Sequence, residues 1–179
     1  MTESSQSSDA AQETSAHHGA SRSGSERERR GSHTPKVDAA LLREVIKIQS
    51  FTRWTGLEVL KAEDGVVETR LKLRQEDMTQ HHGFLHGGLV GFLADNAAAY
   101  AAATVIGDVL TAQYSINFLA PGVGDSFRTR AEVVKAGKRQ VTVRSDVFAQ
   151  SDTGEKLIAT ATVLILPAGA VALEKAPGA

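Results

Sequence analysis

The spacing of apolar residues changes several times along the chain, and the order of these changes predicts its secondary structure. Apolar positions at helical intervals in 37–50 predict a short amphipathic helix, and alternation in 66–73 predicts a strand. Asp64-Gly65 between two apolar runs predicts a hairpin turn. The full predicted order is a helix at 37–50, strands at 57–62 and 66–73, a polar loop at 75–85, a helix at 86–106, and strands at 110–118, 127–133, 141–149 and 156–166.

This order of elements indicates the fold class. Four strands follow the long helix with only short connections between them, so consecutive strands are expected to pair antiparallel. Crossover helices do not recur along the chain, which argues against a doubly wound parallel sheet. We therefore predict an α+β fold in which a curved antiparallel β-sheet wraps one long central helix.

Composition divides the chain into three parts. Residues 1–36 contain no Leu, Ile, Phe, Trp or Tyr, so they lack the apolar surface that ordering requires, and we predict a disordered N-terminal tail. The same segment has no apolar run typical of a secretory signal, and its acidic residues argue against a transit peptide. We predict one domain at 37–167, followed by a short C-terminal tail at 168–179 that is rich in Ala and Gly.

Charge and cysteine content exclude several classes of function. The 179 residues have a formal net charge of −1, whereas nucleic-acid binding normally leaves a basic patch, so we expect no nucleic-acid partner. The sequence contains no cysteine, which excludes disulfides, thiol catalysis and cysteine metal sites. These properties fit a reducing compartment, and we expect a cytoplasmic protein without a membrane partner.

The long predicted helix combines two features suited to chemistry on a carbonyl. It begins with His86-Gly87-Gly88, and a helix N-terminus presents free N–H groups and a partial positive charge to a developing oxyanion. Asp95 is the only charged residue between Gly87 and Gly107 and could act as a nucleophile or a base; a solvated surface aspartate is the alternative. At 100° per residue, Asp95 shares a stripe with Gly91, Ala98, Ala99 and Ala102, while Leu89, Phe92, Leu93, Asn96 and Tyr100 fall on the opposite side.

The spacing of these two features predicts an assembly. Gly87 and Asp95 are about 12 Å apart along one helix, which is too far for both to act on one carbonyl carbon. Two such helices packed antiparallel about a two-fold axis would bring Asp95 of one chain near Gly87 of the other. If both groups act, we expect a homodimer with two shared sites and an inactive monomer.

Three motifs together resemble a known family over residues 45–166. They are Gln80-x5-His86-Gly87-Gly88-x6-Asp95, the strand from Thr111 that ends at Pro121, and the turn Gly137-Lys138-Arg139. The combination is similar to hotdog-fold acyl-CoA thioesterases of the phenylacetic-acid-degradation type, in the 4-hydroxybenzoyl-CoA thioesterase superfamily. The resemblance implies a hotdog fold, hydrolysis of an acyl-CoA thioester to free acid and CoA at a dimer interface, and dimers that pair into tetramers.

The resemblance also implies roles for individual residues. Asp95 matches the catalytic carboxylate, as nucleophile or as general base, and the Gly87 N–H matches the donor to the thioester carbonyl from the partner chain. His86 would support the loop, Gln80 falls where the family places an Asn or Gln, and Thr111 falls where a relative has a hydroxyl that orients the acid or water. Candidate substrate-binding residues are Gly88, beside the donor, and Lys138 and Arg139, for the CoA phosphates.

Other interpretations are weaker on the residues present. A thioester is activated enough for one carboxylate and one oxyanion donor, so no cofactor is expected. His82 and His86 have metal-ligand spacing, but Gly83 intervenes and the motif lacks the glutamate of zinc peptidases, so we expect no metal. A hotdog dehydratase would carry histidine-proline-rich signatures that are absent here. A non-catalytic acyl-CoA-binding hotdog module is the main alternative, and a purely structural dimerisation domain is a third.

Three properties remain open at the level of sequence. Aromatic, medium-chain and hydroxylated acyl groups are all compatible with the motifs, because the acyl pocket would be formed by two chains. The sequence also does not separate nucleophilic from general-base action by Asp95, or a dimer from a tetramer.

Overall fold

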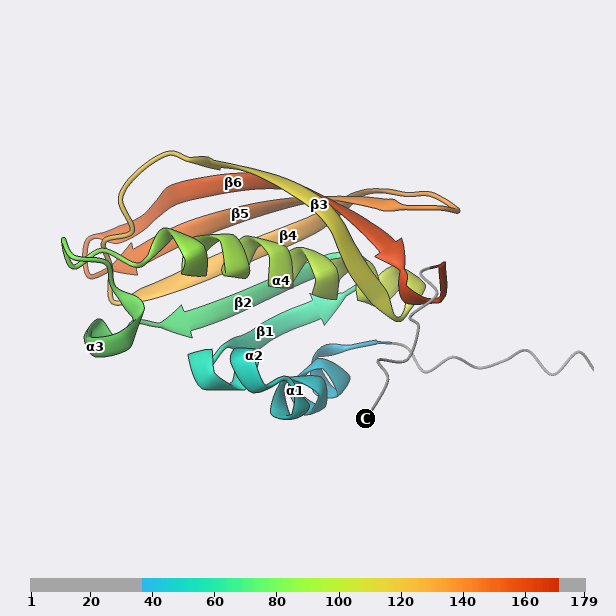
Figure 1. Cartoon of the computed structure of the whole chain (residues 1–179), viewed down its shortest axis with the longest axis horizontal. Coiled ribbons are helices and arrows are strands. Elements are labelled where there is room, and N and C mark those ends of the chain that lie inside the picture. The colour runs from blue at the N-terminus through green and yellow to red at the C-terminus, as the bar shows by residue number, and fades with distance from the viewer. Residues whose placement is uncertain (1–36, 171–179) are drawn as a thin grey trace, which may run out of the picture. The chain divides into compact units, whose positions relative to one another are not determined.

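A twenty-residue helix, α4 (Gly87–Ile106), lies against a six-stranded antiparallel sheet in the computed structural model of the protein (Figure 1). The structure describes residues 37–170. The strand order in the sheet is β1-β2-β4-β5-β6-β3, so β3 crosses the sheet to pair with β6 at its edge. The predicted α+β class with one long helix and an antiparallel sheet is therefore confirmed.

The observed elements follow the predicted order with two additions. The bounds are α1 Ala39–Ile48, α2 Ser50–Thr55, β1 Glu58–Glu63, β2 Val66–Lys72, α3 Gln75–Met78, β3 Val109–Phe118, β4 Ser126–Ala136, β5 Val141–Ser151, β6 Gly154–Pro167 and a 3-10 turn at Ala168–Ala170. The predicted helix at 37–50 ends at Gln49, whose ψ of 97° is extended, and α2 follows it. The predicted polar loop contains α3, a single turn too short to show helical periodicity.

The predicted tails fall largely outside the described residues. Residues 1–36 and 171–179 are not described, and only the 3-10 turn at Ala168–Ala170 belongs to the segment expected as a C-terminal tail.

The sheet surrounds most of α4. The helix contacts β2, β3, β4, β5 and β6, and it has an apolar sequence almost all round, as is typical of a buried helix. Five alanines on it are fully buried: Ala94, Ala97, Ala98, Ala101 and Ala102. By length and composition α4 could also span a membrane, but 61% of the relevant window is buried inside the protein. The helix is therefore the centre of the core.

One stripe of α4 stays partly open to solvent. Its members, which we call the open stripe, are Phe92, Asp95, Asn96, Ala99 and Ala103. These positions fall within about 100° of one another around the helix axis. The sheet does not cover this side, so the only carboxylate of α4 lies on the accessible part of the core helix.

The two edges of the sheet differ in how they are protected. The short edge strand β1 carries Lys61 and Glu63 and has a register shift after Val59. The carbonyl of Val59 accepts a hydrogen bond from the guanidinium of Arg43 at 2.8 Å. The other edge, β3, is ten residues long and carries no charged residue. Its exposed side chains include Tyr114 and Phe118. Charges normally protect an edge against pairing, so β1 is protected, whereas β3 has no charge and its register shift lies near its start, just after Thr111.

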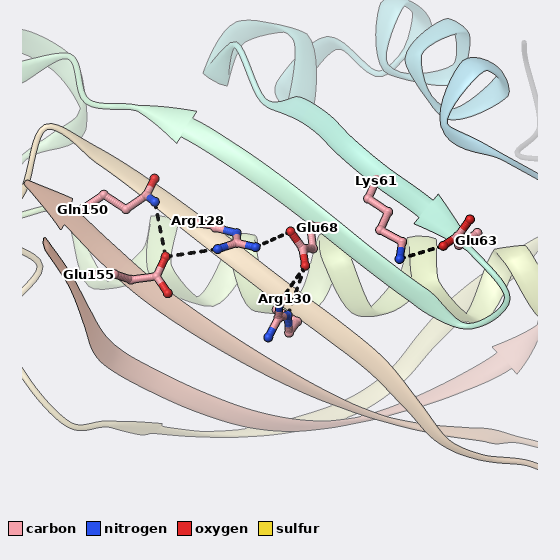
Figure 2. Close-up of polar contacts among 7 residues, drawn as sticks. All are labelled: Lys61, Glu63, Glu68, Arg128, Arg130, Gln150 and Glu155. Atoms are coloured by element: carbon pink, nitrogen blue, oxygen red, sulfur yellow. Dashed lines mark hydrogen bonds and ion pairs between the residues drawn. The ribbon is translucent and has the colours of Figure 1, made fainter.

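Ion pairs cover the face of the sheet opposite α4 (Figure 2). Glu68 on β2 accepts from Arg128 and Arg130 on β4, and Arg128 also pairs with Glu155. The Glu68 side chain is only 14% exposed, and hydrogen bonding from Arg128 lowers the pKa of its carboxyl group. Glu155 also accepts from the amide of Gln150 at 3.2 Å. The network joins four strands, β2, β4, β5 and β6.

The inner face of the sheet contains three buried hydroxyl groups. Thr69 on β2, Thr129 on β4 and Ser145 on β5 are each 0% exposed. Thr69 and Thr129 are directly opposite one another across the β2–β4 pair. Their oxygens and that of Ser145 have no hydrogen-bond partner within the part of the chain that the structure describes. A buried hydroxyl without a partner is destabilising.

Candidate active site

The start of α4 leaves one backbone donor free. His86 is the N-cap, and its Nδ1 accepts a hydrogen bond from the Gly88 N–H at 3.0 Å. The N–H groups of Leu89 and Val90 both donate to the His86 carbonyl. Gly87 is the first residue of the helix, so its N–H has no acceptor within the helix. Among residues 37–170 the Gly87 N–H therefore has no acceptor, and it lies at the positive end of the helix dipole.

The loop before α4 is held in place by backbone hydrogen bonds. The His86 N–H donates to the Met78 carbonyl at 2.9 Å, and the Leu85 N–H donates to the Gly122 carbonyl at 2.9 Å. Gln80 lies in this loop, and its side-chain oxygen accepts from the His82 N–H at 2.6 Å. These contacts fix the chain immediately before the helix start.

Gln80 and Gly87 line the same open pocket. Its volume is about 420 Å³, and Phe118 and Leu119 at the end of β3 form part of its wall. The structure thus brings together two of the residues predicted from the sequence motif, although Gln80 precedes Gly87 by seven positions. The rest of the lining is mostly apolar, so a carbonyl oxygen that reached the Gly87 N–H from this pocket would be in an apolar setting.

Asp95 lies half-buried on the open stripe and has one specific partner. The hydroxyl of Thr111 on β3 donates to Asp95 Oδ1 at 2.7 Å. Thr111 faces α4 because it pairs with buried Ile165 of β6, and the register shifts just after it. The fold therefore joins two candidate residues sixteen positions apart, one from the core helix and one from the edge strand.

The candidate residues form three separate groups in one chain. Gly87 and Asp95 are about 12 Å apart along α4. Lys138 and Arg139 are exposed in the β4–β5 turn, where they line a pocket of about 380 Å³ with Lys135. This turn lies at the end of the sheet opposite α3 and the start of α4 (Figure 1). A single chain does not bring the donor, the carboxylate and the basic turn together.

A second set of polar residues lies next to Asp95 and was not predicted. The Tyr100 hydroxyl donates to the side-chain oxygen of Gln49 at 2.8 Å, and burial raises the pKa of Tyr100 to about 12. Asn96 has a buried Oδ1 without a hydrogen-bond partner among the described residues. Both α4 residues line a pocket between α1 and α4. The one signal in the sequence was the polarity of Asn96 and Tyr100 in an otherwise apolar helix.

The structure also corrects the predicted distribution of side chains around α4. Asn96 and Phe92 were expected on the side opposite Asp95, but all three belong to the open stripe. Gly91 and Ala98, which were expected beside Asp95, are buried, and a Cβ at Gly91 would lie 3.1 Å from the Tyr114 hydroxyl. The sheet covers the part of the helix surface that contains Gly91 and Ala98. Asp95 therefore lies at the border between the covered surface and the open stripe.

The histidines of the loop do not form a metal site with other residues. Within residues 37–170, no group of three His, Cys, Asp or Glu side chains is placed to hold a metal ion. His81 and His82 are exposed and stack on each other with ring centroids 3.9 Å apart. His86 uses its Nδ1 for the helix cap.

Comparisons with known proteins agree on one family. A family model described as the thioesterase superfamily matches residues 82–156, a range that contains the helix start, Asp95, Thr111 and the basic turn. A protein of Saccharolobus solfataricus described as a "putative esterase" is 35% identical over 112 residues, which cover 61% of this chain and 73% of that protein.

Solved structures show the same likeness. A thioesterase family protein from Silicibacter pomeroyi is 34% identical with a TM-score of 0.67, covering 70% of this chain and 93% of that one. A mutant of the phenylacetic acid degradation protein PaaI from Thermus thermophilus is 29% identical with a TM-score of 0.59, covering 66% of this chain and 98% of that one.

Proposed function

The chain belongs to the thioesterase superfamily of hotdog-fold proteins, and from this premise we propose that it is a hydrolase that cleaves acyl-CoA thioesters to a free acid and CoA. The observation that carries the proposal is the Asp95–Thr111 pair at the border of the open stripe. It supplies an oriented carboxylate on the accessible side of an otherwise apolar core helix.

The Thr111 hydroxyl fixes how Asp95 can act. Its hydrogen bond engages Oδ1, and Oδ2 has no hydrogen-bond partner among residues 37–170. Oδ2 can take a proton from a water that attacks the thioester carbonyl. It can also attack that carbonyl itself, which expels CoA and forms a mixed anhydride that water then hydrolyses to regenerate Asp95. Both routes require a carboxylate held in one orientation, and both release the thiol of CoA and the free acid.

The second component is an oxyanion donor. As the thioester carbon becomes tetrahedral, its oxygen gains negative charge, and a preorganised N–H stabilises that charge most where water is excluded. The free Gly87 N–H at the N-terminus of α4 meets this need, and the His86 cap holds the first turn in shape. Gly88 and Gln80 would line the path of the thioester beside this donor.

Two chains are needed to combine the components. Gly91 is midway between Gly87 and Asp95, so a two-fold axis level with Gly91 along the helix would bring Asp95 of one chain beside the Gly87 N–H of the other. The uncharged edge strand β3, with exposed Tyr114 and Phe118, favours pairing with a second copy of itself. We propose a homodimer with two shared sites, which pairs into a tetramer.

The remaining predicted residues would bind the CoA moiety. Lys138 and Arg139 are exposed cations on the β4–β5 turn, and together with Lys135 they would attract the CoA phosphates. Their position away from the start of α4 within one chain is compatible with a long substrate that extends across the interface.

A panel of acyl-CoA esters assayed for free thiol release tests the proposal. Wild type should turn over at least one class of ester, and Asp95→Asn should lose activity while keeping its fold. Asp152→Asn in the exposed β5–β6 turn is the matched control and should behave as wild type. Binding of the esters without turnover by the wild type would reject the hydrolase and favour an acyl-CoA-binding module.

The shared site has its own test in a purified heterodimer. One chain carries Asp95→Asn and the other carries Gly87→Pro, so only one of the two shared sites keeps both groups. Such a dimer should have about half of the wild-type activity, although each homodimeric variant is inactive. An inactive heterodimer would mean that both groups act within one chain.

A further inference from the structure

A groove between α1 and α4 is lined at one end by Asn96, the residue that follows Asp95. Its volume is about 290 Å³, and its walls are mostly aliphatic. The side chains that define it are Leu41, Leu42 and Val45 on α1, Ala99 and Ala103 on α4, and Val109 at the start of β3. Leu41 is 38% exposed, so the groove opens to solvent along α1.

The groove continues from Asp95 along the axis of α4. Residues 95, 99, 103 and 107 are four positions apart, and the last three line the groove. At 1.5 Å per residue, the distance from Asp95 to Gly107 is about 18 Å. A thioester carbonyl held at Asp95 would therefore have a linear apolar track in front of its acyl group.

Polar groups restrict what the groove can hold. The Gln49 and Tyr100 side chains bond to each other at 2.8 Å and offer no charge to a ligand. Asp108 lines the far end of the groove and is exposed. A negative charge at that end disfavours an acyl group with a terminal carboxylate.

We propose that this groove takes the acyl group, and that the substrates are CoA thioesters of straight, uncharged aliphatic acids. The inference rests on the proposed thioesterase function. An aromatic ring would use only a short part of the track, whereas a flexible chain can follow all of it. A water molecule occupies about 30 Å³ of liquid and a methylene group is similar in size, so the groove accommodates roughly six to ten carbons.

The test compares chain lengths in wild type and in a variant with a shortened groove. Ala103→Leu fills the track about 12 Å beyond Asp95 along the axis and retains a good helix-forming residue. Ala40→Leu makes the same change at an exposed position of α1 outside the groove and serves as the control.

In wild type, kcat/KM should rise about fourfold per methylene from butanoyl-CoA to octanoyl-CoA, and octanoyl-CoA should exceed phenylacetyl-CoA. Ala103→Leu should lower kcat/KM for octanoyl-CoA at least about tenfold and leave butanoyl-CoA nearly unaffected, whereas Ala40→Leu should match wild type. Equal effects on both esters, or a preference for the aromatic ester, would overturn the proposal.

A binding measurement separates this proposal from the hydrolase itself. The thioethers S-octyl-CoA and S-ethyl-CoA cannot be hydrolysed, and calorimetry should show tighter binding of the octyl compound by wild type and not by Ala103→Leu. If that result holds while no ester is turned over, the groove assignment stands and the hydrolase proposal fails. Equal affinity for the two thioethers would instead assign the groove to another occupant, such as a second copy or a terminal segment of this chain.

Discussion

Gly87→Pro tests the proposed oxyanion donor by removing a single backbone N–H. Proline lacks this group, yet it is favoured at the first position of a helix, where the N–H has no acceptor within the helix. Proline also requires an extended residue before it, and His86 already has φ −59° and ψ 133°. The substitution therefore removes the donor at a position that tolerates proline.

The size of the effect follows from the first turn of α4. The Gly88 N–H is already bonded to His86 Nδ1, and those of Leu89 and Val90 are bonded to the His86 carbonyl, so none of them can replace Gly87. Loss of one oxyanion donor costs about 2.7–4 kcal/mol of transition-state stabilisation. We expect kcat to fall about 100-fold to 1,000-fold, with a much smaller change in KM.

The assay is thiol release under saturating acyl-CoA, together with thermal unfolding of each variant. Gly87→Ala is the matched control because it keeps the N–H and its Cβ would lie 3.7 Å from the Phe118 ring, an ordinary contact. It should retain at least about a tenth of wild-type kcat. A folded Gly87→Pro protein with more than a tenth of wild-type kcat would refute the assignment. An equal loss in Gly87→Ala would show that space, and not the N–H, is what matters.

Three further substitutions test other contacts. Thr111→Val removes the donor to Asp95 and should lower kcat about 10-fold to 100-fold. Thr111→Ser keeps a hydroxyl and should retain most of the wild-type kcat. Equal kcat for the two variants would contradict the orienting role. Thr129→Val replaces a buried hydroxyl without a partner and should raise the free energy of unfolding in urea by about 1 kcal/mol, and a loss of stability would show that the hydroxyl is bonded. Glu68→Gln should cost about 1 kcal/mol at pH 7. Arg128 lowers the folded-state pKa of Glu68, so this difference in stability is present above the unfolded-state pKa and should disappear as pH falls through the lowered folded-state pKa. Urea unfolding of both proteins at pH 7 and at pH 3 should show this change. An equal difference in stability at the two pH values would reject the ion pair as its cause.

Local patterns in the sequence predicted most of the secondary structure. Alternation in the strands reflects burial of one face, and the apolar composition of 86–106 reflects burial on almost all sides of the helix. Both patterns can be recognised in the sequence alone. The break at Gln49 was missed because α1 and α2 are both short and apolar residues continue across it. The single turn α3 was missed because four residues carry no period.

The candidate site likewise has features that the sequence predicted and features that it did not. The sequence by itself determined the glycine start of α4, the lone carboxylate Asp95 and the distance between them, because a helix has a fixed rise per residue. Only the tertiary structure decided which arc of α4 stays open, because that depends on how far a sheet of six strands curves around the helix. It also decided that Asn96 and Phe92 stay partly open to solvent together with Asp95, and that α1 and α4 enclose a groove. These contacts join segments that are distant in the chain, so packing between elements determines them and local periodicity does not.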